Sequence, residues 1–499
     1  MGIFRSLQQR GIEKRDALAR KLAAQGFSVI DDPSLCKKRE IILNRGLDSP
    51  DSNFFVFLKT SFFGRTKVFF TDPSRGEGGK AFSKRELMRR FSSFKAGEGW
   101  TEKVVDEVAK ASMAKSRSAR FVDMHGHWGE NEVGYGKERI RRDDGVSPRQ
   151  KVIREMMLWH IDIDATGYHN WIEADHFLDI SEKERKAGIL KIPSLELTLP
   201  RAVPDPNSSN GPHLMLYFRS LESGLGFCED TYDMGRKFPG MAPALRREEV
   251  LERIKMMRDK GELALGVAHP YGATDLGFRN LLMGILNDLE LGQPLDYVKD
   301  LVRDYGDVVA IYNPTFSNKA FSFEKRPIVQ AFFEDIITRY LGSNAKMTQN
   351  NVTYAFAMYC KHELGKRVYF EHDTHVYAGV PHYWRMVSPL AYGRTVIHFT
   401  DWEKAEVAFK HGLDLTPDEF IGILRRGRFE RDGEVIKVIN AKLSFDAFLE
   451  QRSGKLVPIR ERKSPLRSIY IIPQQIKKAW QYFQLTSGDL RDRVRGMFN

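Results

Sequence analysis

The sequence of 499 residues is poor in cysteine and has no long apolar run. Its three cysteines, Cys36, Cys228 and Cys360, lie far apart and form no C-x-x-C pair. This usage argues against a disulfide scaffold and predicts a reducing compartment, the cytoplasm. No stretch of about 18 apolar residues is present, and the first residues lack the apolar core of a signal peptide, so we expect no transmembrane segment.

The sequence gives no support for three common catalytic or phosphate-binding features. The sequence contains no G-x-S-x-G motif, which argues against a serine hydrolase of that type. Cys228 is followed by two acidic residues, which would raise its thiol pKa and disfavour a nucleophilic role. The glycine-rich segment 74–80 lacks the spacing of a phosphate-binding P-loop.

Charge is unevenly distributed along the chain. The net charge of +12 divides into +11 for residues 1–120, −4 for residues 121–400 and +5 for residues 401–499. An acidic central part suits a metal site, because carboxylates neutralise cations. Basic flanks suit a polyanion, such as nucleic acid or anionic lipid, although a solvated basic surface explains them equally well. The sequence leaves the oligomeric state open.

Hydrophobic periodicity predicts three parts. Residues 1–120 are expected to form a basic α/β accessory module, with a helix over 5–26 and two strands that pair across a turn at Gly64. Residues 121–400 alternate seven apolar runs with helix-like stretches, a pattern that predicts a parallel sheet closed into a barrel or near-barrel. Residues 401–499 form a basic α+β extension, with a helix starting at Thr416-Pro417.

The seven apolar runs carry metal-binding residue types at their ends. Histidine and carboxylate bind first-row divalent metals, and the ends of parallel strands meet on one side of a barrel. The candidates are His125 and His127 in HGH, Glu132 in the following loop, His176 in ADH, Glu196 in LEL, His213 in PHL, His269 in AHP, and Asp373 and His375 in HDTH. Nine such ligands predict a cluster of two or three divalent ions, for which Mn, Fe or Zn is suitable.

Such a cluster predicts metal-assisted hydrolysis, most simply of a phosphate ester. Two or three cations would lower the pKa of a bridging water towards ~7 and neutralise charge on the phosphate oxygens. The residues expected to matter most for catalysis are His125, His127, His269 and Asp373. A second polar group, His160, Asp162, Asp164 and His169, precedes the second apolar run and is interpreted as structural or helix-terminating.

The order of these motifs resembles the PHP (polymerase and histidinol phosphatase) family over about residues 121–380. The resemblance rests on the segments FVDMHGHWGENE, WIEADHF, IPSLELTL, PHLMLYF, LGVAHPYG and YFEHDTH. It implies a distorted (β/α)7 TIM-like barrel, the nine ligands named above and a di- or trinuclear metal-dependent phosphoesterase. It also implies basic residues near the rim that hold phosphate, for which Arg236, Arg279 and Lys319 are candidates.

Several positions depart from the family pattern. Glu132 stands where Asp is more usual, Ala310 where the sixth strand commonly has glutamate, and EHDTH replaces G-S-D-x-H, so that Glu371 and His372 are bulkier and could narrow the pocket. These departures bear on the substrate more than on the metals. The leading substrate is a phosphorylated small molecule or a nucleotide.

Two other functions stay open. The same metals could serve a nuclease or phosphodiesterase that grips DNA or RNA through its basic flanks. A non-catalytic regulatory or structural module with the same fold is the second alternative, against which the complete ligand set argues.

Overall fold

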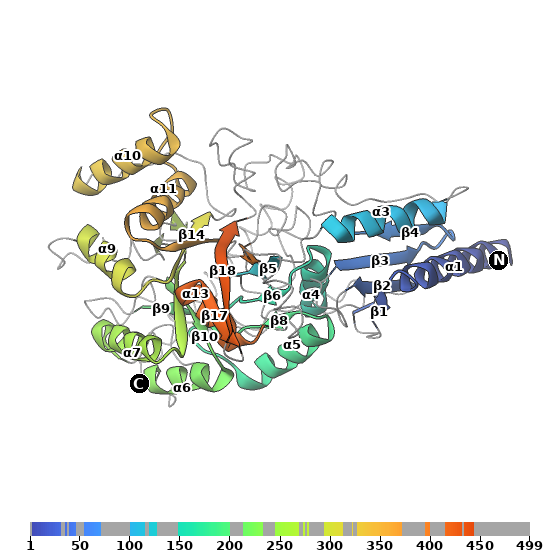
Figure 1. Cartoon of the computed structure of the whole chain (residues 1–499), viewed down its shortest axis with the longest axis horizontal. Helices are drawn as coiled ribbons and strands as arrows, with labels where there is room; N and C mark the ends of the chain where they lie inside the picture. Colours follow the sequence, from blue (N-terminus) through green and yellow to red (C-terminus); the bar gives the residue numbers. More distant parts are fainter. Residues whose placement is uncertain are drawn as a thin grey trace, which may run out of the picture.

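The computed structural model describes residues 2–30, 35–36, 39–45, 54–70, 100–114, 119–126, 148–199, 213–232, 245–268, 273–274, 277–278, 294–312, 322, 327–371, 395–399, 415–431 and 434–443. These residues form a mixed α/β protein in which helices surround two six-stranded sheets, and a four-stranded sheet extends to one side (Figure 1). The short strands β12 (Ala273–Thr274) and β13 (Gly277–Phe278) form a separate ribbon. Within this described part, no helix is long and apolar enough to cross a membrane.

The N-terminal module is an antiparallel sheet covered by two helices. The strands are β1 (Ser28–Val29), β2 (Glu40–Arg45), β3 (Phe54–Thr60) and β4 (Thr66–Phe69), and the helices are α1 (Gly2–Ala23) and α3 (Trp100–Ala114). Thr60 lies opposite Thr66, so the predicted pairing across Gly64 is confirmed. Phe54, Val56 and Leu58 alternate along β3 and pack with Leu18 and Leu22 of α1, as the two-residue period of a strand dictates.

The other face of this sheet belongs to the core of the main body. Phe55 and Phe57 join the large hydrophobic cluster there, and α4 (Pro148–Leu158) packs against β3. Arg154 of α4 forms a bidentate ion pair with Glu40, with N–O distances of 2.5 and 2.9 Å. The ring of His160 stacks on Phe54 with centroids 4.4 Å apart. The module is therefore attached through a continuous core and a buried pair.

The main body contains two six-stranded sheets. The first has the spatial order β15 (Arg367–Phe370), β14 (Val308–Tyr312), β11 (Leu263–Val267), β10 (His213–Phe218), β9 (Ser194–Thr198) and β7 (Tyr168–His169). The second has the order β17 (Arg428–Arg431), β18 (Glu434–Leu443), β16 (Thr395–Phe399), β5 (Ala119–Asp123), β6 (Ile163–Asp164) and β8 (Leu190–Lys191). Strand β16 lies at the end of the predicted barrel part, and β17 and β18, from the predicted C-terminal extension, extend this sheet beyond it.

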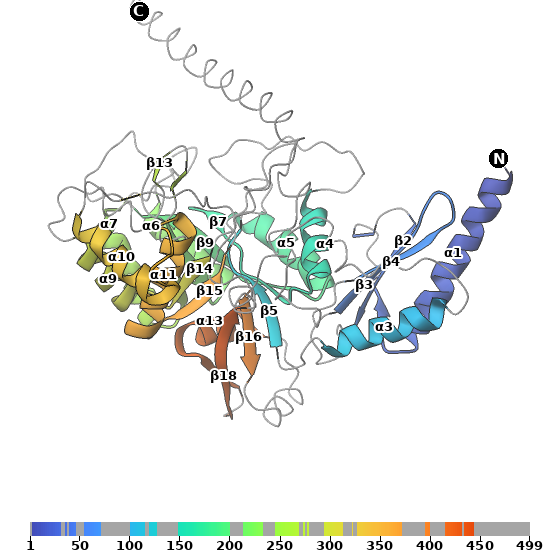
Figure 2. The same cartoon turned by 90° about the horizontal axis from the view of Figure 1, so that it is seen from above.

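Helices cover the outer side of the first sheet (Figures 1 and 2). The helices of the main body, besides α4, are α5 (Ala174–Lys186), α6 (Leu221–Thr231), α7 (Arg247–Asp259), α9 (Pro294–Asp304), α10 (Pro327–Leu341), α11 (Gln349–Glu363) and α13 (Pro417–Arg426). Helix α6 lies on β10, α7 on β11 and α11 on β14 and β15, while α10 packs on α11. The expected alternation of strand and helix is present in this part of the chain.

The prediction of a parallel sheet for residues 121–400 is wrong for strand β10 of the first sheet and for β16 of the second, which is antiparallel to β5. The pairs β7/β9, β11/β14 and β14/β15 are parallel, as are β5/β6 and β6/β8 in the second sheet. Strand β10 is antiparallel to both β9 and β11. Only residues 199–212 separate β9 from β10, and an antiparallel neighbour needs no helical crossover.

The prediction of a strand over residues 169–176 is also wrong beyond its first residue. Strand β7 ends at His169, and helix α5 begins at Ala174. The buried residues of α5 are Phe177, Ile180 and Glu184, whose spacing of three and four is that of a helix face. The apolar run was therefore the start of an amphipathic helix.

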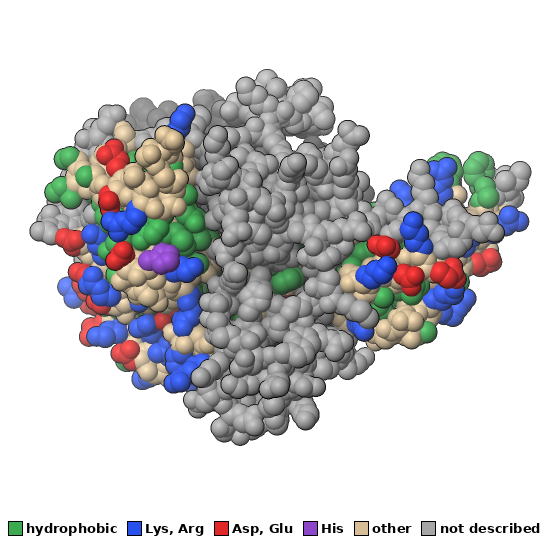
Figure 3. All heavy atoms as spheres, turned by 45° about the horizontal axis from the view of Figure 1, so that its top comes forward, with side chains coloured by type: hydrophobic (Ala, Val, Ile, Leu, Met, Phe, Trp, Pro, Cys, Tyr) green, Lys and Arg blue, Asp and Glu red, His purple; other side chains and the backbone are tan. Residues whose placement is uncertain are grey.

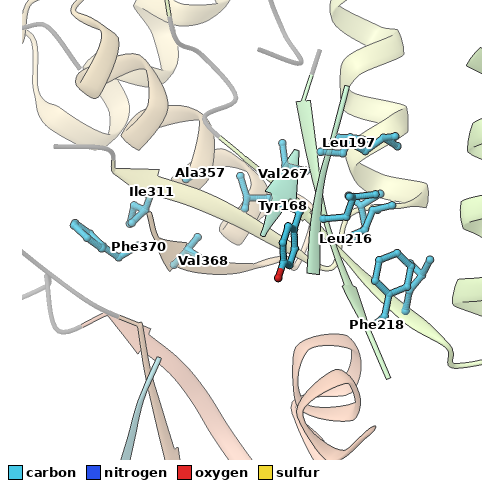
Figure 4. Close-up of a cluster of buried hydrophobic side chains, with 14 of the residues drawn as sticks. Tyr168, Leu197, Leu216, Phe218, Val267, Ile311, Ala357, Val368 and Phe370 are labelled. Atoms are coloured by element: carbon cyan, nitrogen blue, oxygen red, sulfur yellow. The ribbon is translucent and has the colours of Figure 1, made fainter. Parts of the chain in front are cut away.

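The central strands of the first sheet, β9, β10 and β11, are buried on both faces. Residues such as Leu197, Leu216, Val267, Ile311 and Val368 point towards the covering helices and form the large core cluster (Figure 4). The alternate residues on the opposite face form a second cluster that draws on both sheets and includes Val122, Met124, Met215, Tyr217, Val308, Tyr369 and Ile397. Phe420, Ile423 and Leu424 of α13 pack into this second cluster from one end.

The predicted start of α13 is confirmed by its cap. Thr416 Oγ1 accepts a hydrogen bond from the backbone N–H of Glu419, and the Glu419 carboxylate accepts one from the N–H of Thr416. The helix ends at Gly427, which adopts φ 70°. The Nη1 of Arg367, at the start of β15, donates to the last carbonyls of the helix, those of Leu424 and Arg425. Helix α13 is thereby fixed beside the start of β15.

Candidate functional site

Three histidines surround the carboxylate of Glu196 in the middle of β9. Its Oε1 lies 2.6 Å from Nδ1 of His213 and 3.7 Å from Nε2 of His125, and its Oε2 lies 2.7 Å from Nδ1 of His169. All four side chains are buried. His213 is the first residue of β10, and His169 is in register with Glu196 across the parallel β7/β9 pair. The strand pairing therefore brings these groups together.

A second carboxylate faces the other side of the His125 ring. Nδ1 of His125 lies 2.8 Å from Oε2 of Glu371, and both side chains are inaccessible to solvent. His125 follows β5 by two residues and Glu371 directly follows β15, so this contact joins the two sheets. We refer to His125, His169, Glu196, His213 and Glu371 as the polar cluster.

Two buried tyrosines extend the polar cluster inwards. The hydroxyl of Tyr369 donates to Glu371 Oε2 at 3.4 Å, and that of Tyr217 donates to the carbonyl of Met124 at 3.1 Å. Burial raises the pKa of Tyr217 well above its ordinary value, and the negative charge of Glu371 adds to the effect. Burial likewise raises the pKa of Tyr369. Both phenols therefore stay protonated and act as donors that hold the chain around His125 and Glu371.

Asn170 fixes the strand that carries His169. It adopts φ 59°, a left-handed conformation that asparagine tolerates better than most residues. Its Oδ1 accepts from the N–H of Thr198 at 2.6 Å and its Nδ2 donates to Thr198 Oγ1 at 3.1 Å. Its own N–H donates to the carbonyl of Glu196 at 2.9 Å. These bonds continue the β7/β9 pairing beyond the last strand residue and hold His169 beside Glu196.

The structure brings together three of the predicted metal ligands, namely His125, Glu196 and His213. The predicted ligands His127, Glu132, His269, Asp373 and His375 lie outside the described residues, as do the predicted phosphate-binding residues Arg236, Arg279 and Lys319. Their roles stay predictions. Of the four predicted ligands that are described, these three meet at one point, although Glu196 lies in the middle of β9 and not at its end, whereas His176 lies elsewhere.

His176 has a different environment. It lies in the first turn of α5, and its Nδ1 is 3.2 Å from the hydroxyl of Tyr168. Tyr168 packs in the large core cluster under the helices, while its neighbour His169 points into the polar cluster. Because successive residues of a strand face opposite sides, His176 touches the face of β7 opposite to His169.

Sequence reasoning missed two members of the polar cluster. The sequence analysis interprets His169 as structural or helix-terminating because its group precedes the second apolar run, whereas the strand itself ends at His169 and helix α5 begins at Ala174. Glu371 was interpreted as bulk that narrows the pocket. Its position two residues before Asp373 would put both on one side of an extended segment, which was the available signal. The interpretation of Asp162 is confirmed, since it accepts the N–H of Phe121 at 2.8 Å.

The chemistry of the polar cluster fits a divalent metal. Carboxylate oxygens accept hydrogen bonds, so an Nδ1 beside Glu196 or Glu371 is the protonated nitrogen, and Nε2 of the same ring keeps its lone pair for a cation. In the described part of the chain taken alone, no group of three or more His, Cys, Asp or Glu side chains is arranged to hold a metal ion. A metal ion at this position would therefore need further ligands, for which the residues predicted at 127, 132, 269, 373 and 375 are the candidates.

Cys228 and Cys360 do not add a nucleophile to this site. Burial raises the pKa of Cys228 to about 12, and Glu229 contributes in the same direction. The predicted direction of this pKa shift is confirmed, although burial is its main cause. Cys360 is fully buried in α11, and burial raises its thiol pKa as well.

No protein-family model matches this chain, and no curated protein matches it.

Proposed function

We propose that the chain is a metal-dependent phosphoesterase whose site is built around the polar cluster. The observation that carries this proposal is the convergence of three histidines and two glutamates, all buried, from strands of both sheets and the residues that follow them. Burying so many ionisable groups together is costly unless they pair with one another or coordinate a metal. The motif resemblance of residues 121–380 to the PHP family supports the same conclusion.

We propose further that the two six-stranded sheets are parts of one distorted barrel. Strand β6 is followed after three residues by β7, and β8 after two residues by β9, so the chain passes twice from one sheet to the other. At the opposite edge, the N–H of Phe370 in β15 donates to Thr395 Oγ1 of β16, and β16 pairs with β5. A closed barrel requires a strand order that returns to its starting strand, and these links between the two sheets support that proposal.

The same arrangement supports a site at one end of the barrel. Helix α13 packs into the inner cluster beside the start of β15, whereas Glu371 follows the end of β15. The polar cluster therefore lies at the carboxyl end of this strand. Barrel enzymes of this type carry their active sites at the carboxyl ends of the strands.

The residues have separable tasks in this proposal. His125, His169, Glu196 and His213 would hold divalent ions together with His127, Glu132, His269, Asp373 and His375. The bound ions would activate water and offset the charge of the phosphate group. Glu371 orients His125 by accepting from its Nδ1, which leaves Nε2 aimed towards Glu196. Arg236, Arg279 and Lys319 are proposed to bind the phosphate of a small molecule or nucleotide.

The test is metal content per chain, measured on protein purified without chelator, combined with turnover of a generic phosphomonoester and a phosphodiester. We expect two to three ions of Mn, Fe or Zn, and a loss of at least ~100-fold in turnover in His125→Ala and Asp373→Ala. His362→Ala is the matched control, because His362 is an exposed histidine in the last turn of α11. Its turnover should stay at the wild-type level.

Each outcome bears on the proposal. Turnover of the diester in preference to the monoester would make the chain a phosphodiesterase or nuclease acting at the same site. Metal-free protein with no turnover of either ester after addition of Mn²⁺ or Zn²⁺ would refute the proposal. So would near-wild-type turnover in both site variants.

A further inference from the structure

The N-terminal module exposes a group of large apolar side chains at one end. Phe62 and Phe63 form the turn between β3 and β4 and are 62% and 65% exposed, and Phe4 and Leu7 in the first turns of α1 are 53% and 42% exposed. The rings of Phe4 and Phe63 are 6.5 Å apart, and those of Phe62 and Phe63 are 5.6 Å apart. We call these four residues the apolar tip.

The apolar tip is held in place by a close contact between backbones. A Cβ atom at Gly11 of α1 would lie 2.2 Å from the carbonyl oxygen of Gly64, and one at Gly64 would lie 2.0 Å from that of Leu7. The hydroxyl of Thr66 donates to the carbonyl of Gly11 at 2.9 Å. The two glycines therefore let the turn lie directly on the helix. This contact fixes the phenylalanines of the turn beside those of the helix.

Basic side chains surround the apolar tip. Arg5 and Arg10 of α1, Arg65 of the turn and Lys67 of β4 are all exposed. The guanidinium of Arg39 lies 5.7 Å from the centre of the Phe62 ring. Figure 3 shows hydrophobic and basic side chains at the end of this module that lies farthest from the main body, with acidic side chains along its lower side. The end of the module thus combines exposed apolar side chains with positive charge.

We propose that this surface binds an anionic lipid membrane, into which the apolar tip inserts. Exposed phenylalanine and leucine gain by entering the boundary of the acyl chains, and adjacent arginine and lysine are attracted to acidic headgroups. The phenylalanine rings pack edge-to-face or tilted against one another at a protruding end. A single-stranded nucleic acid needs ring faces open for stacking along a basic groove, so the membrane fits this geometry better.

This surface is separate from the polar cluster, and the inference does not depend on the proposed phosphoesterase activity. The apolar tip belongs to α1 and the β3/β4 turn, whereas the polar cluster lies in the two sheets of the main body. The shared core between β3 and α4 would carry the main body to the membrane with the module. Membrane binding would thus set where the chain acts, whatever it acts on.

The test is co-sedimentation of the full chain with two kinds of vesicle. One is pure phosphatidylcholine, and in the other about one third of the lipid is phosphatidylserine. We expect binding to the acidic vesicles, and a loss of on the order of tenfold in Phe62→Ser/Phe63→Ser. A similar loss is expected in Arg5→Gln/Arg65→Gln, together with a weaker dependence on salt.

The matched control is Ile328→Ser. Ile328 is 78% exposed in α10, far along the chain from the apolar tip, and its loss should leave vesicle binding unchanged. Equal binding by wild type and the double phenylalanine variant would overturn the proposal. It would also be overturned if wild type failed to sediment with acidic vesicles, or if it bound a single-stranded oligonucleotide through Phe62 and Phe63 and ignored the vesicles.

Discussion

The carboxylate of Glu371 lies 2.8 Å from Nδ1 of His125, with both side chains fully buried and no shared strand between them. His125 follows β5 of the second sheet, and Glu371 follows β15 of the first. A carboxylate in this position fixes the tautomer and the orientation of the ring, so that Nε2 is presented on the opposite side. Glu371 is therefore a positioning residue for His125 in the proposed metal site.

Replacing Glu371 by glutamine should weaken metal binding without removing a predicted ligand. The amide nearly preserves the shape of the side chain but offers a poorer acceptor to Nδ1. We expect a loss of about 10- to 100-fold in metal affinity, measured by competition with a chromophoric chelator. Glu184→Gln is the control, because Glu184 is a buried glutamate on α5. Unchanged metal affinity in Glu371→Gln, or an equal loss of metal affinity in both variants, would contradict the role of Glu371 in positioning His125.

His169 and His176 give a direct comparison between the geometry and the sequence pattern. His169 faces Glu196 at 2.7 Å, whereas His176 contacts Tyr168 on the other face of β7. We expect His169→Ala to lower metal affinity by about 10- to 100-fold and to lower turnover with it. We expect His176→Ala to change both by less than ~3-fold. The reverse order would restore His176 as the ligand from this part of the chain.

Several elements of the fold could be predicted from the sequence because their local signals are strong. The pairing across Gly64, the helix start at Thr416 and the strands around Glu196 and His213 all follow from turn residues, caps and apolar periods that act over a few positions. Such signals are local, so they are readable without a structure.

The wrong predictions arose where a short apolar run is compatible with a strand and with a helix. They also arose where the strand or side chain that a residue contacts is distant in the sequence. The apolar residues around Trp171 and Ile172 are compatible with a strand. The burial of Phe177 and Ile180 on one face of α5 shows that the following residues form a helix. The antiparallel direction of β10 depends on which strands it joins, which no local pattern encodes. The pairing of Glu371 with His125 spans 246 positions, so it could not be inferred from spacing.

Gly11 tests the contact between α1 and the β3/β4 turn. A glycine inside an exposed helix is normally improved by alanine, by roughly 0.5–1 kcal/mol. At Gly11 the added Cβ would lie 2.2 Å from the carbonyl oxygen of Gly64, so we expect Gly11→Ala to lower the free energy of unfolding by about 1–3 kcal/mol. The measurement is urea unfolding of the full chain.

The matched control is Gly226→Ala in α6, where an added Cβ meets nothing within 4 Å. It should stabilise the chain by roughly 0.5–1 kcal/mol, because only the helix propensity changes. If both variants stabilise equally, the turn does not lie on the helix as described.

Lys191 and Asp164 form a buried ion pair between β8 and β6, with Nζ 2.8 Å from Oδ2. Nζ also donates to the carbonyl of Thr166 at 2.8 Å and to its hydroxyl at 3.2 Å, so the ammonium group is fully bonded. Burial opposes ionisation of Asp164, but the charge and hydrogen bond of Lys191 outweigh it and lower the pKa of the carboxyl. The pair thus holds β8, a short strand at the edge of the second sheet, to its neighbour β6.

Lys191→Met should cost about 3–5 kcal/mol in the free energy of unfolding at pH 7, because it leaves a carboxylate buried without its cation. In the wild type, the lowered pKa of Asp164 contributes stability above the unfolded pKa of about 3.9, and this contribution is lost as the pH falls through the folded value. In the variant the buried carboxyl takes up a proton more readily. The difference in the free energy of unfolding between wild type and variant should therefore narrow between pH 7 and pH 5.

The control is Lys183→Met, which removes an exposed ion pair with Asp179 and should cost less than ~0.5 kcal/mol at either pH. A difference for Lys191→Met that stays constant over this range would mean that the loss of Lys191 does not raise the pKa of Asp164 into it, and would contradict this account of the pair.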